Sequence, residues 1–344
     1  FPDRSSHPAL FEAKRCQQPF KVDLQHAETL ELVLTSEYLF KHCDRECLNW
    51  QLLNKDGVLD RGQEIISLAP RQSNCFGLSN HIAAATEHCW LNVWITQIDD
   101  TLWSDAGHEV ARWQFVLNKE VALAETVIDS GGATIRKTPQ CYEVNAGSSQ
   151  WCIDRKSGFV ISWQKEGEPR LASPLRDNFT RALIDNDIGT SEAGRLDPNS
   201  WMARWQLSGL FDLEHRCEKI ICDENASVIE VEHGYYHGTA LRLTSRWRHE
   251  FSATGELAIQ IEVDVMPAMP PLPRVGVQFQ LTNKPGTVTW FGRGPHENYP
   301  DRLVSADIGY WTQPVAAMHT DYIFPSENGL RCEVTELALG DVQL

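Results

Sequence analysis

Short runs in which apolar and polar residues alternate recur along this chain of 344 residues, and they constrain its fold more than any other feature. Alternation with a period of two is typical of β-strands whose two faces meet different surroundings. Lys55-Asp-Gly57 predicts a hairpin turn, because Asp-Gly tolerates the positive φ values that such turns need. In this part of the chain we expect strands at 31–40, 47–53, 90–96 and 110–117. Their even spacing predicts an immunoglobulin-like β-sandwich at about 27–118.

Strand-like runs resume beyond a connection at 119–138, which ends in Ser130-Gly-Gly132. The expected strands are 151–154, 159–163, 227–233, 240–249, 256–265 and 275–281. Strict alternation in the last three predicts sheets with one buried face. Helical turns are expected only at 196–209, with Asp197 or Asn199 as N-cap, and at 212–224. The absence of a repeat of roughly 20 to 50 residues argues against a solenoid or a propeller. The sequence therefore predicts an all-β fold.

Composition and charge exclude several classes of partner. A formal charge of -16 and a pI near 5.2 argue against nucleic acid, which requires a basic face. No apolar run reaches the ~18 residues that a membrane-spanning helix needs. The 10 cysteines contain no Cys-x-x-Cys pair and no regular spacing, so zinc binding is not indicated. Free thiols in a reducing cytoplasm are the preferred interpretation.

A dense polar segment from Pro174 to Trp201 stands apart from this pattern. Acids and arginines crowd its first half, and Gly189 then opens a polar stretch that closes at Asp197-Pro198. Glycine absorbs large changes in φ and ψ, whereas proline fixes the backbone beside it, as a mobile lid requires. A solvated loop between strands has the same composition. The residues alone leave both interpretations open.

Four motifs in one order carry a resemblance. They are the segment 174–201, Gly292-Arg-Gly-Pro-His-Glu-Asn-Tyr-Pro-Asp-Arg302, Phe324-Pro-Ser-Glu-Asn-Gly-Leu-Arg331 and Phe1-Pro-Asp-Arg-Ser-Ser-His-Pro-Ala-Leu10. Together they resemble the C-terminal part of the large multidomain β-galactosidases of glycoside hydrolase family 2. The likeness runs in register from Phe1 to about Gly340. Because the chain starts without Met and stops on an apparently unfinished strand, we interpret it as an internal fragment.

The resemblance implies a domain order and an activity. Residues 1–26 would be the tail of the catalytic barrel, 27–118 the Ig-like linking domain, 119–138 a connection, and 139–344 most of a large galactose-mutarotase-like β-supersandwich. The implied parent is a cytoplasmic, tetrameric, retaining enzyme that removes terminal non-reducing β-D-galactose from lactose-type substrates. Its two catalytic carboxylates lie on the barrel before Phe1. We therefore expect no catalytic residue here, an inactive fragment, and the N-terminal catalytic part as its partner.

The resemblance also implies residues near the galactoside. Phe1 supports the sugar pocket and offers its backbone carbonyl to a sodium ion, and Arg4 lies near the same pocket. The parent uses Mg and Na, bound mainly by domains outside this chain, because one carbonyl cannot hold a hard cation. The loop that begins at Gly189 opens and closes in the family. The groups available to it for hydrogen bonding belong to Thr190, Ser191, Glu192, Arg195 and Asp197.

The tryptophans divide between core and surface interpretations. Strand spacing predicts core positions for Trp50, Trp90, Trp94 and Trp113 rather than sugar stacking. Trp201 and Trp205, four residues apart, are expected on one face of a helical turn. Trp290 and Phe291 precede the Gly292 motif and are better candidates for a groove.

Several acidic motifs have simpler interpretations than catalysis. His296-Glu297 and Glu327 are expected in an ion-paired network that braces loops. Asp185-Asn-Asp187 lacks the Gly and Glu of a calcium loop, and Gly292-Arg-Gly294 lacks the context of a dinucleotide site. Two alternatives to a β-galactosidase fragment stay open, namely a free-standing carbohydrate-binding β-sandwich and the small subunit of a split β-galactosidase. A measurement of sugar affinity for the isolated chain would distinguish the carbohydrate-binding β-sandwich from a β-galactosidase fragment.

Overall fold

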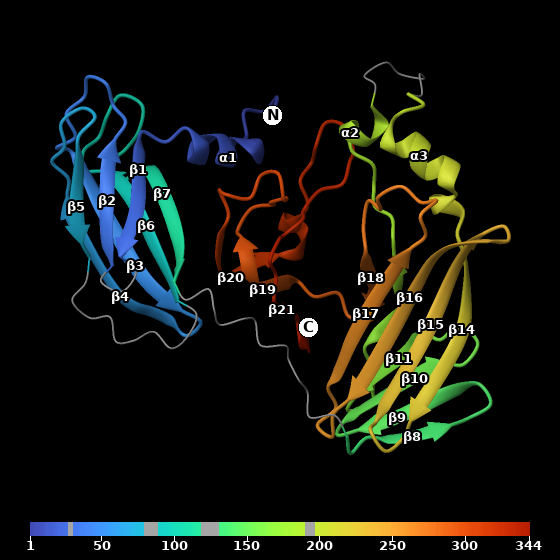
Figure 1. The fold of residues 1–344 in the computed structure, drawn as a ribbon. Helices are drawn as coiled ribbons and strands as arrows, with labels where there is room; N and C mark the ends of the chain where they lie inside the picture. The colour runs from blue at the N-terminus through green and yellow to red at the C-terminus, as the bar shows by residue number, and fades with distance from the viewer. Residues whose placement is uncertain (27–29, 79–88, 118–130, 190–196) are drawn as a thin grey trace. The chain divides into compact units, whose positions relative to one another are not determined.

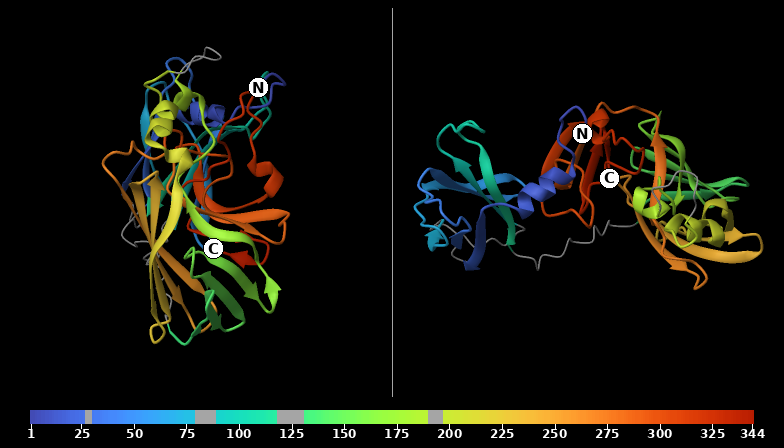
Figure 2. Two further views of the ribbon diagram at one scale, coloured as in Figure 1. Left: turned by 90° about the vertical axis from the view of Figure 1, so that its right-hand side faces the viewer. Right: turned by 90° about the horizontal axis from the view of Figure 1, so that it is seen from above.

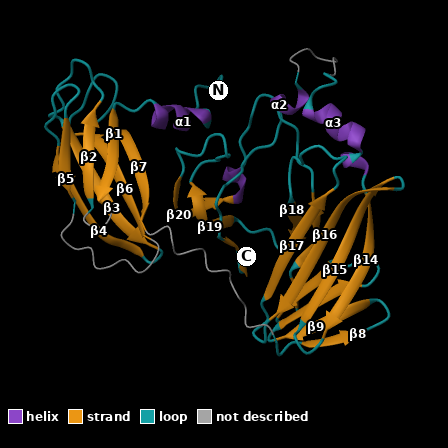
Figure 3. Cartoon of the chain, viewed as in Figure 1, coloured by secondary structure: helices purple, strands orange, loops and turns teal. Residues whose placement is uncertain are grey.

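Antiparallel β-sheets make up most of the protein in a computed structural model that describes residues 1–26, 30–78, 89–117, 131–189 and 197–344 (Figure 1). The predicted all-β class is confirmed. Helical elements are short, as the purple segments of Figure 3 show. Those of the described ranges are α1 (Ala9–Cys16), α2 (Asp185–Ile188), α3 (Trp201–Ser208) and the 3₁₀ turns η1 (Leu210–Asp212) and η2 (Val315–Met318).

The chain forms two compact units that interleave along the sequence. Unit 1 comprises Phe1–Leu123, Pro285–Thr320 and Asn328–Leu344, and unit 2 comprises Ala124–Lys284 and Asp321–Glu327. This division does not test the domain boundaries expected from the sequence, because a compact unit can combine segments of two domains.

Unit 1 contains the expected sandwich. One sheet has the order β1-β2-β5 and the other β4-β3-β6-β7. Their strands are β1 (Phe20–His26), β2 (Glu31–Ser36), β3 (Glu46–Asn54), β4 (Gly57–Ile65), β5 (Ser73–Gly77), β6 (Cys89–Gln97) and β7 (Glu109–Leu117). The hairpin predicted at Lys55-Asp-Gly57 joins β3 to β4, with Gly57 at φ +135°. Because Phe20 pairs with Ser36, the first sheet begins before residue 27.

Alternation along the strands builds the core of this sandwich. Leu32 and Leu34 of β2 and Leu48 of β3 are fully buried, and intervening residues are more exposed. Burial of each such side chain stabilises the fold by about 1.5–3 kcal/mol. The core prediction is correct for Trp50 and Trp113, and Trp90 is also buried, though on the opposite face of β6 from this core. It is wrong for Trp94, which lies on the other face of β6, where its ring meets Arg112 at 5.6 Å.

A further sheet of unit 1 has the order β20-β19-β21-β22. Its strands are β19 (Thr287–Gly294), β20 (Asp307–Pro314), β21 (Glu336–Leu339) and β22 (Val342–Gln343). The groove interpretation of Trp290 and Phe291 is wrong, since both are buried. Trp290 Nε1 donates to Arg293 O at 3.0 Å, and the Phe291 ring lies 5.3 Å from that of Trp90. Adjacent strand residues face opposite sides, so β19 is covered on both.

Buried charges connect three elements of unit 1. Asp307, at the start of β20, accepts hydrogen bonds from Arg15 of α1 at 2.8 Å and from Arg112 of β7. The side chains of Arg15 and Asp307 are each only 8% exposed. Nearby, Gln114 Nε2 donates to Ile308 O at 2.8 Å. These bonds fix β20 against both α1 and β7.

Unit 2 is a second, larger sandwich. Its first sheet runs β18-β13-β11-β10-β9-β8, with β12 beside β11, and its second runs β14-β15-β16-β17. The left view of Figure 2 shows the green and the yellow-to-orange sheets as separate layers. Side chains of both layers, such as Ile153, Trp151, Val231 and Phe251, share one core. The strands are β8 (Thr134–Lys137), β9 (Cys141–Ala146), β10 (Ser149–Asp154), β11 (Val160–Lys165), β12 (Glu168–Pro169), β13 (Leu171–Asn178), β14 (Glu214–Asp223), β15 (Val228–His237), β16 (Ala240–Phe251), β17 (Leu257–Val265) and β18 (Gly276–Leu281).

Two local predictions in unit 2 are wrong. Residues 214–223 form β14 rather than helical turns, because Ile220 and Cys222 alternate toward the core while the backbone pairs with β15. The N-cap of α3 is Ser200, not Asp197 or Asn199, and its Oγ accepts the Ala203 N–H at 3.2 Å. The expected helix itself is present.

Candidate functional site

The two ends of the segment predicted to serve the sugar site touch each other in unit 2. Gly189 caps α2 with φ +78°, and its N–H donates to Asp185 O at 3.1 Å. A Cβ placed on Gly189 would lie 3.0 Å from Ser200 Cβ and 3.1 Å from Asp197 Oδ2. Both the left-handed backbone and this close approach require glycine. Gly189 and Asp197 are therefore adjacent, whereas Thr190, Ser191, Glu192 and Arg195 lie outside the described residues.

Asp197 shapes the turn that leads into α3. Its Oδ1 accepts the Asn199 N–H at 2.8 Å, and its backbone carbonyl accepts the Ser200 N–H at 3.0 Å. An aspartate that bonds the backbone two residues ahead forms an Asx turn. The carboxylate thus orients the helix start with one oxygen and faces Gly189 with the other.

A buried ion pair supports α2 below this junction. Arg181 donates Nη1 to Asp187 Oδ2 at 2.6 Å and Nη2 to Asp187 Oδ1 at 3.1 Å. Asp187 Oδ2 also accepts the Ile184 N–H at 2.9 Å, and the Asp187 side chain is 5% exposed. Bidentate Arg–carboxylate pairs fix orientation as well as distance. The crowded charges of this segment therefore hold α2 in place.

The predicted aromatic face of α3 is confirmed. The rings of Trp201 and Trp205 are stacked at 6.1 Å, with an angle of 25° between their planes. Trp205 is buried and donates Nε1 to Pro271 O at 2.8 Å. Trp201 is exposed, and the Arg204 guanidinium lies 5.0 Å above its ring. An exposed indole thus follows directly after the turn made by Asp197.

Asp177, one of the acids of the dense polar segment, anchors β13 to the second sheet. It accepts hydrogen bonds from Tyr235 Oη at 2.6 Å, Ser245 Oγ at 2.9 Å and Trp247 Nε1 at 3.0 Å. Burial raises the pKa of the Asp177 carboxyl, and the three donors act against that rise. Burial and the adjacent carboxylate raise the pKa of Tyr235 in turn. With every donor aimed inward, Asp177 has a structural role.

Three histidines lie in the core between the sheets of unit 2, which no sequence motif indicated. His215 Nε2 and His233 Nδ1 are 2.9 Å apart, and the Phe159 ring stacks on both imidazoles. His249 Nδ1 donates to Ile229 O at 3.1 Å. Burial lowers the pKa of His215, lowers that of His233 to about 3 and lowers that of His249 to about 4. All three are therefore neutral at neutral pH.

The remaining predicted site residues, Phe1 and Arg4, belong to unit 1. Phe1 is half-buried and Arg4 is exposed, with φ +67°. The Arg4 N–H donates to the Phe1 carbonyl at 2.9 Å, so this oxygen closes a tight turn. A hard cation takes several oxygen ligands from more than one segment. These residues alone do not fit a sodium site, and we assign no chemical step to such an ion here.

The buried acid of the Gly292 motif braces loops, as predicted. Glu297 is 3% exposed and accepts hydrogen bonds from Arg302, from Thr320 Oγ1 at 2.9 Å and from the Gly329 N–H at 2.8 Å. In unit 2, Arg274 Nη2 bonds Glu327 Oε1 at 2.7 Å. Both acids are thus engaged in ion pairs between loops.

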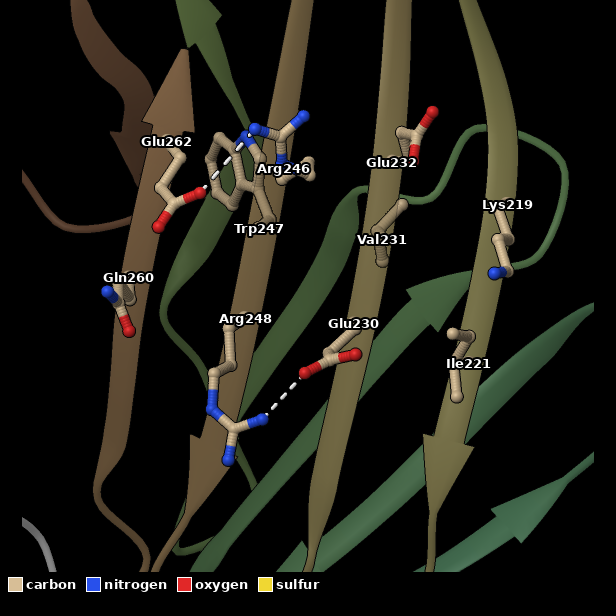
Figure 4. A pocket seen from close by; sticks show the side chains of 10 residues that line it. All are labelled: Lys219, Ile221, Glu230, Val231, Glu232, Arg246, Trp247, Arg248, Gln260 and Glu262. Atoms are coloured by element: carbon tan, nitrogen blue, oxygen red, sulfur yellow. Dashed lines mark hydrogen bonds and ion pairs between the residues drawn. The ribbon is translucent and has the colours of Figure 1, made fainter. Parts of the chain in front are cut away.

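An open cavity of about 240 Å³ lies on the outer face of the β14–β17 sheet (Figure 4). Opposite charges alternate across the strands in the order Lys219, Glu232, Arg246 and Glu262. Arg248 of the next row bonds Glu230 at 2.6 Å. The Trp247 indole is buried, so the cavity has no aromatic platform for a sugar ring. Of the predicted site residues that the structure describes, Phe1, Arg4, Gly189 and Asp197, none lines it.

Across the described ranges, no group of three or more His, Cys, Asp or Glu side chains could hold a metal ion. All 10 cysteines are free thiols, as predicted. No helix among the described residues is long and apolar enough to cross a membrane.

Comparison with known proteins gives matches to both sandwiches. The family described as beta galactosidase small chain matches residues 145–343, and the family described as beta-galactosidase, domain 4, matches residues 32–118. The β-galactosidase of Aeromonas hydrophila is 44% identical over all of this chain and 34% of its own length. The β-galactosidases of Klebsiella pneumoniae strain 342 and Pectobacterium atrosepticum are 40% and 38% identical over 99% of this chain and 33% of theirs.

The chain thus spans about a third of the length of the curated relatives that it matches. Its own two sandwiches, the Gly189 junction and the loop brace around Glu297 belong to that matched third. The family match covers more than half of the chain, and we conclude that this protein belongs to the β-galactosidase small-chain family.

Proposed function

We propose that this chain is the C-terminal region of a retaining β-galactosidase that hydrolyses terminal non-reducing β-D-galactose residues. The proposal rests on relatives named β-galactosidase that match the whole chain at 38–44% identity. Retention requires two carboxyl groups about 5 Å apart, one as nucleophile and one as acid/base. Among the described residues, the buried acids are Glu46, Asp187, Glu297 and Asp307, and each is bonded to a protein donor. We assign both catalytic carboxylates to the part of the enzyme outside this chain.

The contact between Gly189 and Asp197 carries the proposed role of this chain in the site. It closes the ends of a polar segment against each other, beside the exposed indole of Trp201. This contact fixes where the chain leaves α2 and where it re-enters the fold before α3. Opening and closing around the sugar, with Phe1 and Arg4 in the pocket, remains a prediction.

Activity on a chromogenic β-galactoside tests the proposal. We expect no hydrolysis by the 344-residue chain and hydrolysis by a chimera in which it replaces the matched C-terminal third of the Aeromonas hydrolase. Activity of the chain alone would place catalytic carboxylates within it and overturn the assignment. A correctly folded but inactive chimera would equally contradict a contribution to a galactosidase site.

The setting of the whole enzyme is part of the proposal. We propose a cytoplasmic tetramer that binds Mg and Na mainly through its other domains. Ten free thiols agree with a reducing compartment. Light scattering of the chimera and its activity after chelation would test the oligomer and the metals.

A further inference from the structure

Two neighbouring loops at one end of the first sandwich expose large apolar side chains to solvent. Leu39 and Phe40 lie in the loop after β2, and Ile98, Leu102 and Trp103 lie in the loop after β6. We call these five residues the apolar tip. Phe40 is 93% exposed, and Leu102 is fully exposed. Scattered apolar residues on a surface are ordinary, but a group of this size on adjacent loops marks an interaction surface.

Backbone pairing and an ion pair place the loops side by side. Glu46 at the start of β3 pairs with Gln97 at the end of β6, so both loops leave the same end of the sandwich (Figure 1). Beyond that pair, the Ile98 N–H donates to Arg45 O at 3.0 Å. Arg45 Nε also bonds Asp99 Oδ2 at 2.6 Å. The apolar tip therefore belongs to one continuous edge of the sandwich.

Internal hydrogen bonds give the second loop a defined shape. The Thr101 N–H donates to Ser104 O at 2.8 Å, and the Ser104 N–H donates to Thr101 Oγ1 at 3.1 Å. The Ala106 N–H donates to Asp100 Oδ1 at 2.8 Å. Leu102 and Trp103 occupy the bend between these bonded residues. Their exposure therefore follows from a structured turn, and such a turn binds a partner with little further loss of entropy.

The first loop is anchored on both sides of its exposed pair. The Tyr38 ring packs edge-on against Phe20 of the core at 5.6 Å. Lys41 bonds the buried Glu46 and lies 5.0 Å above the Tyr38 ring. Because Tyr38 and Lys41 are fixed, Leu39 and Phe40 project outward together. Phenylalanine and tryptophan projecting from fixed loops are the kind of side chain that dominates protein interfaces.

The charged residues around the apolar tip indicate what kind of partner surface would bind there. Asp44, Asp100 and Asp105 are exposed near the apolar tip, while Arg45 and Lys41 are each paired with an acid. This acidic rim is unfavourable to anionic lipid and to a second copy of a chain with charge -16. It favours a protein surface with an apolar centre and basic or neutral edges.

We propose that the apolar tip packs against the part of a β-galactosidase polypeptide that lies outside this matched third. The chain matches 34% of the Aeromonas relative, so a polypeptide of about twice its length is available to cover the tip. This proposal rests on the proposed function and names one docking surface that the assembled enzyme uses. Burial of Trp103 and Phe40 would contribute much of that contact, as aromatic anchors do at interfaces.

Hydroxyl-radical footprinting of the 344-residue chain and of the Aeromonas chimera tests the contact. We expect oxidation of the Leu102–Trp103 peptide to slow about tenfold in the chimera, because a packed interface excludes water. Ile65 on the edge strand β4 is the matched control, since it is 67% exposed and Trp103 is 68% exposed. Its oxidation should be unchanged. Equal oxidation of the tip in both proteins would overturn the proposal, as would protection in the separate chain that grows with its concentration.

A variant separates docking from folding. Leu102→Ser with Trp103→Ser should lower the thermal midpoint of the chimera and leave that of the separate chain unchanged, whereas Ile65→Ser should affect both alike. Galactosidase activity of the unaltered chimera separates the proposed docking of the apolar tip from the proposed β-galactosidase function. An active chimera with an unprotected tip would contradict this contact and leave the enzyme assignment intact. A folded, inactive chimera with a protected tip would do the reverse.

Discussion

The guanidinium of Arg181 holds both carboxylate oxygens of Asp187, at 2.6 and 3.1 Å, with only 5% of the aspartate side chain exposed. Removing one partner of a buried pair leaves the other charge unpaired, which typically costs about 3–5 kcal/mol. We expect Asp187→Ala to destabilise unit 2 by this amount in urea denaturation. Glu230→Ala, which breaks the exposed pair with Arg248, is the control and should cost less than about 1 kcal/mol. Equal costs would contradict the structural role of Asp187.

Gly189→Ala should act through both backbone and contact. Its φ of +78° carries a penalty of about 1–2 kcal/mol for an L-residue, and the new Cβ would press on Ser200 and Asp197. Gly238→Ala is the matched control, because Gly238 has φ +63° but open space around its Cβ. We expect Gly189→Ala to destabilise more than Gly238→Ala in the separate chain. In the active chimera it should also change kcat/KM, and unchanged kinetics on lactose and on an activated galactoside would contradict a role for this junction.

Asp307 offers a test of how unit 1 is held together. Its carboxylate forms ion pairs with Arg15 and Arg112 in a largely buried site. Asp307→Asn removes the negative charge that balances two guanidinium groups, so we expect a loss of about 3 kcal/mol or more. Glu333→Gln, at an exposed pair with Arg293, should have little effect. Hydrogen exchange should increase first in α1 and β20, and an unchanged exchange rate in α1 would show that Arg15 finds another anchor.

The histidine cluster predicts loss of stability in acid. The folded pKa values of His233 and His249 are about 3 and about 4, below the unfolded value of about 6.5. As pH falls below about 6.5 the unfolded chain binds protons that the native core excludes, and each histidine removes up to about 1.4 kcal/mol per pH unit. The effect is absent above that pH. Burial also raises the pKa of the Asp177 carboxyl in the same core, so the difference between variants is the useful quantity.

Urea denaturation between pH 7 and pH 4.5 measures this dependence. His249→Leu replaces one buried imidazole with an apolar side chain of similar size. It should reduce the pH dependence of the free energy of unfolding by about one proton. His237→Gln changes an exposed histidine of the same strand pair and should leave it unchanged. Parallel curves for the unaltered chain and His249→Leu would show that His249 binds its proton equally well in the native and unfolded states, which would contradict the lowered pKa.

The strands that the sequence predicted well are those whose alternation follows burial. Leu48 and Trp50 of β3 and the inward residues of β15 and β16 could be identified because one face of each sheet is apolar. Strand β13 was missed, since Pro174 and the charged pair Arg176-Asp177 look like a loop. Asp177 faces inward only because Tyr235, Ser245 and Trp247 supply donors from other strands. Such compensation depends on tertiary contacts that no local pattern contains.

In the candidate site, too, some features could be predicted from the sequence and others depend on tertiary contacts. Gly189 and Asp197 could be named from motif and resemblance, and a helix with Trp201 and Trp205 on one face was expected from their spacing. The contact between the two ends, and the Arg181–Asp187 support beneath them, depend on chain geometry that spacing does not determine. The same holds for Trp290, whose burial follows from sheet cover on both faces of β19.

The interleaving of the two units has a consequence for biosynthesis. A ribosome releases a chain from its N-terminus, and domains generally fold as they emerge. The β1–β7 sandwich and the strands of unit 2 are therefore complete while Asp307 is still to be translated. Arg15 and Arg112 therefore stay solvated, without Asp307, while nearly all of unit 2 is synthesised. Helix α1 acquires its anchor from a strand translated much later, so a nascent chain halted before β20 would carry a folded second sandwich and an α1 without its Asp307 partner.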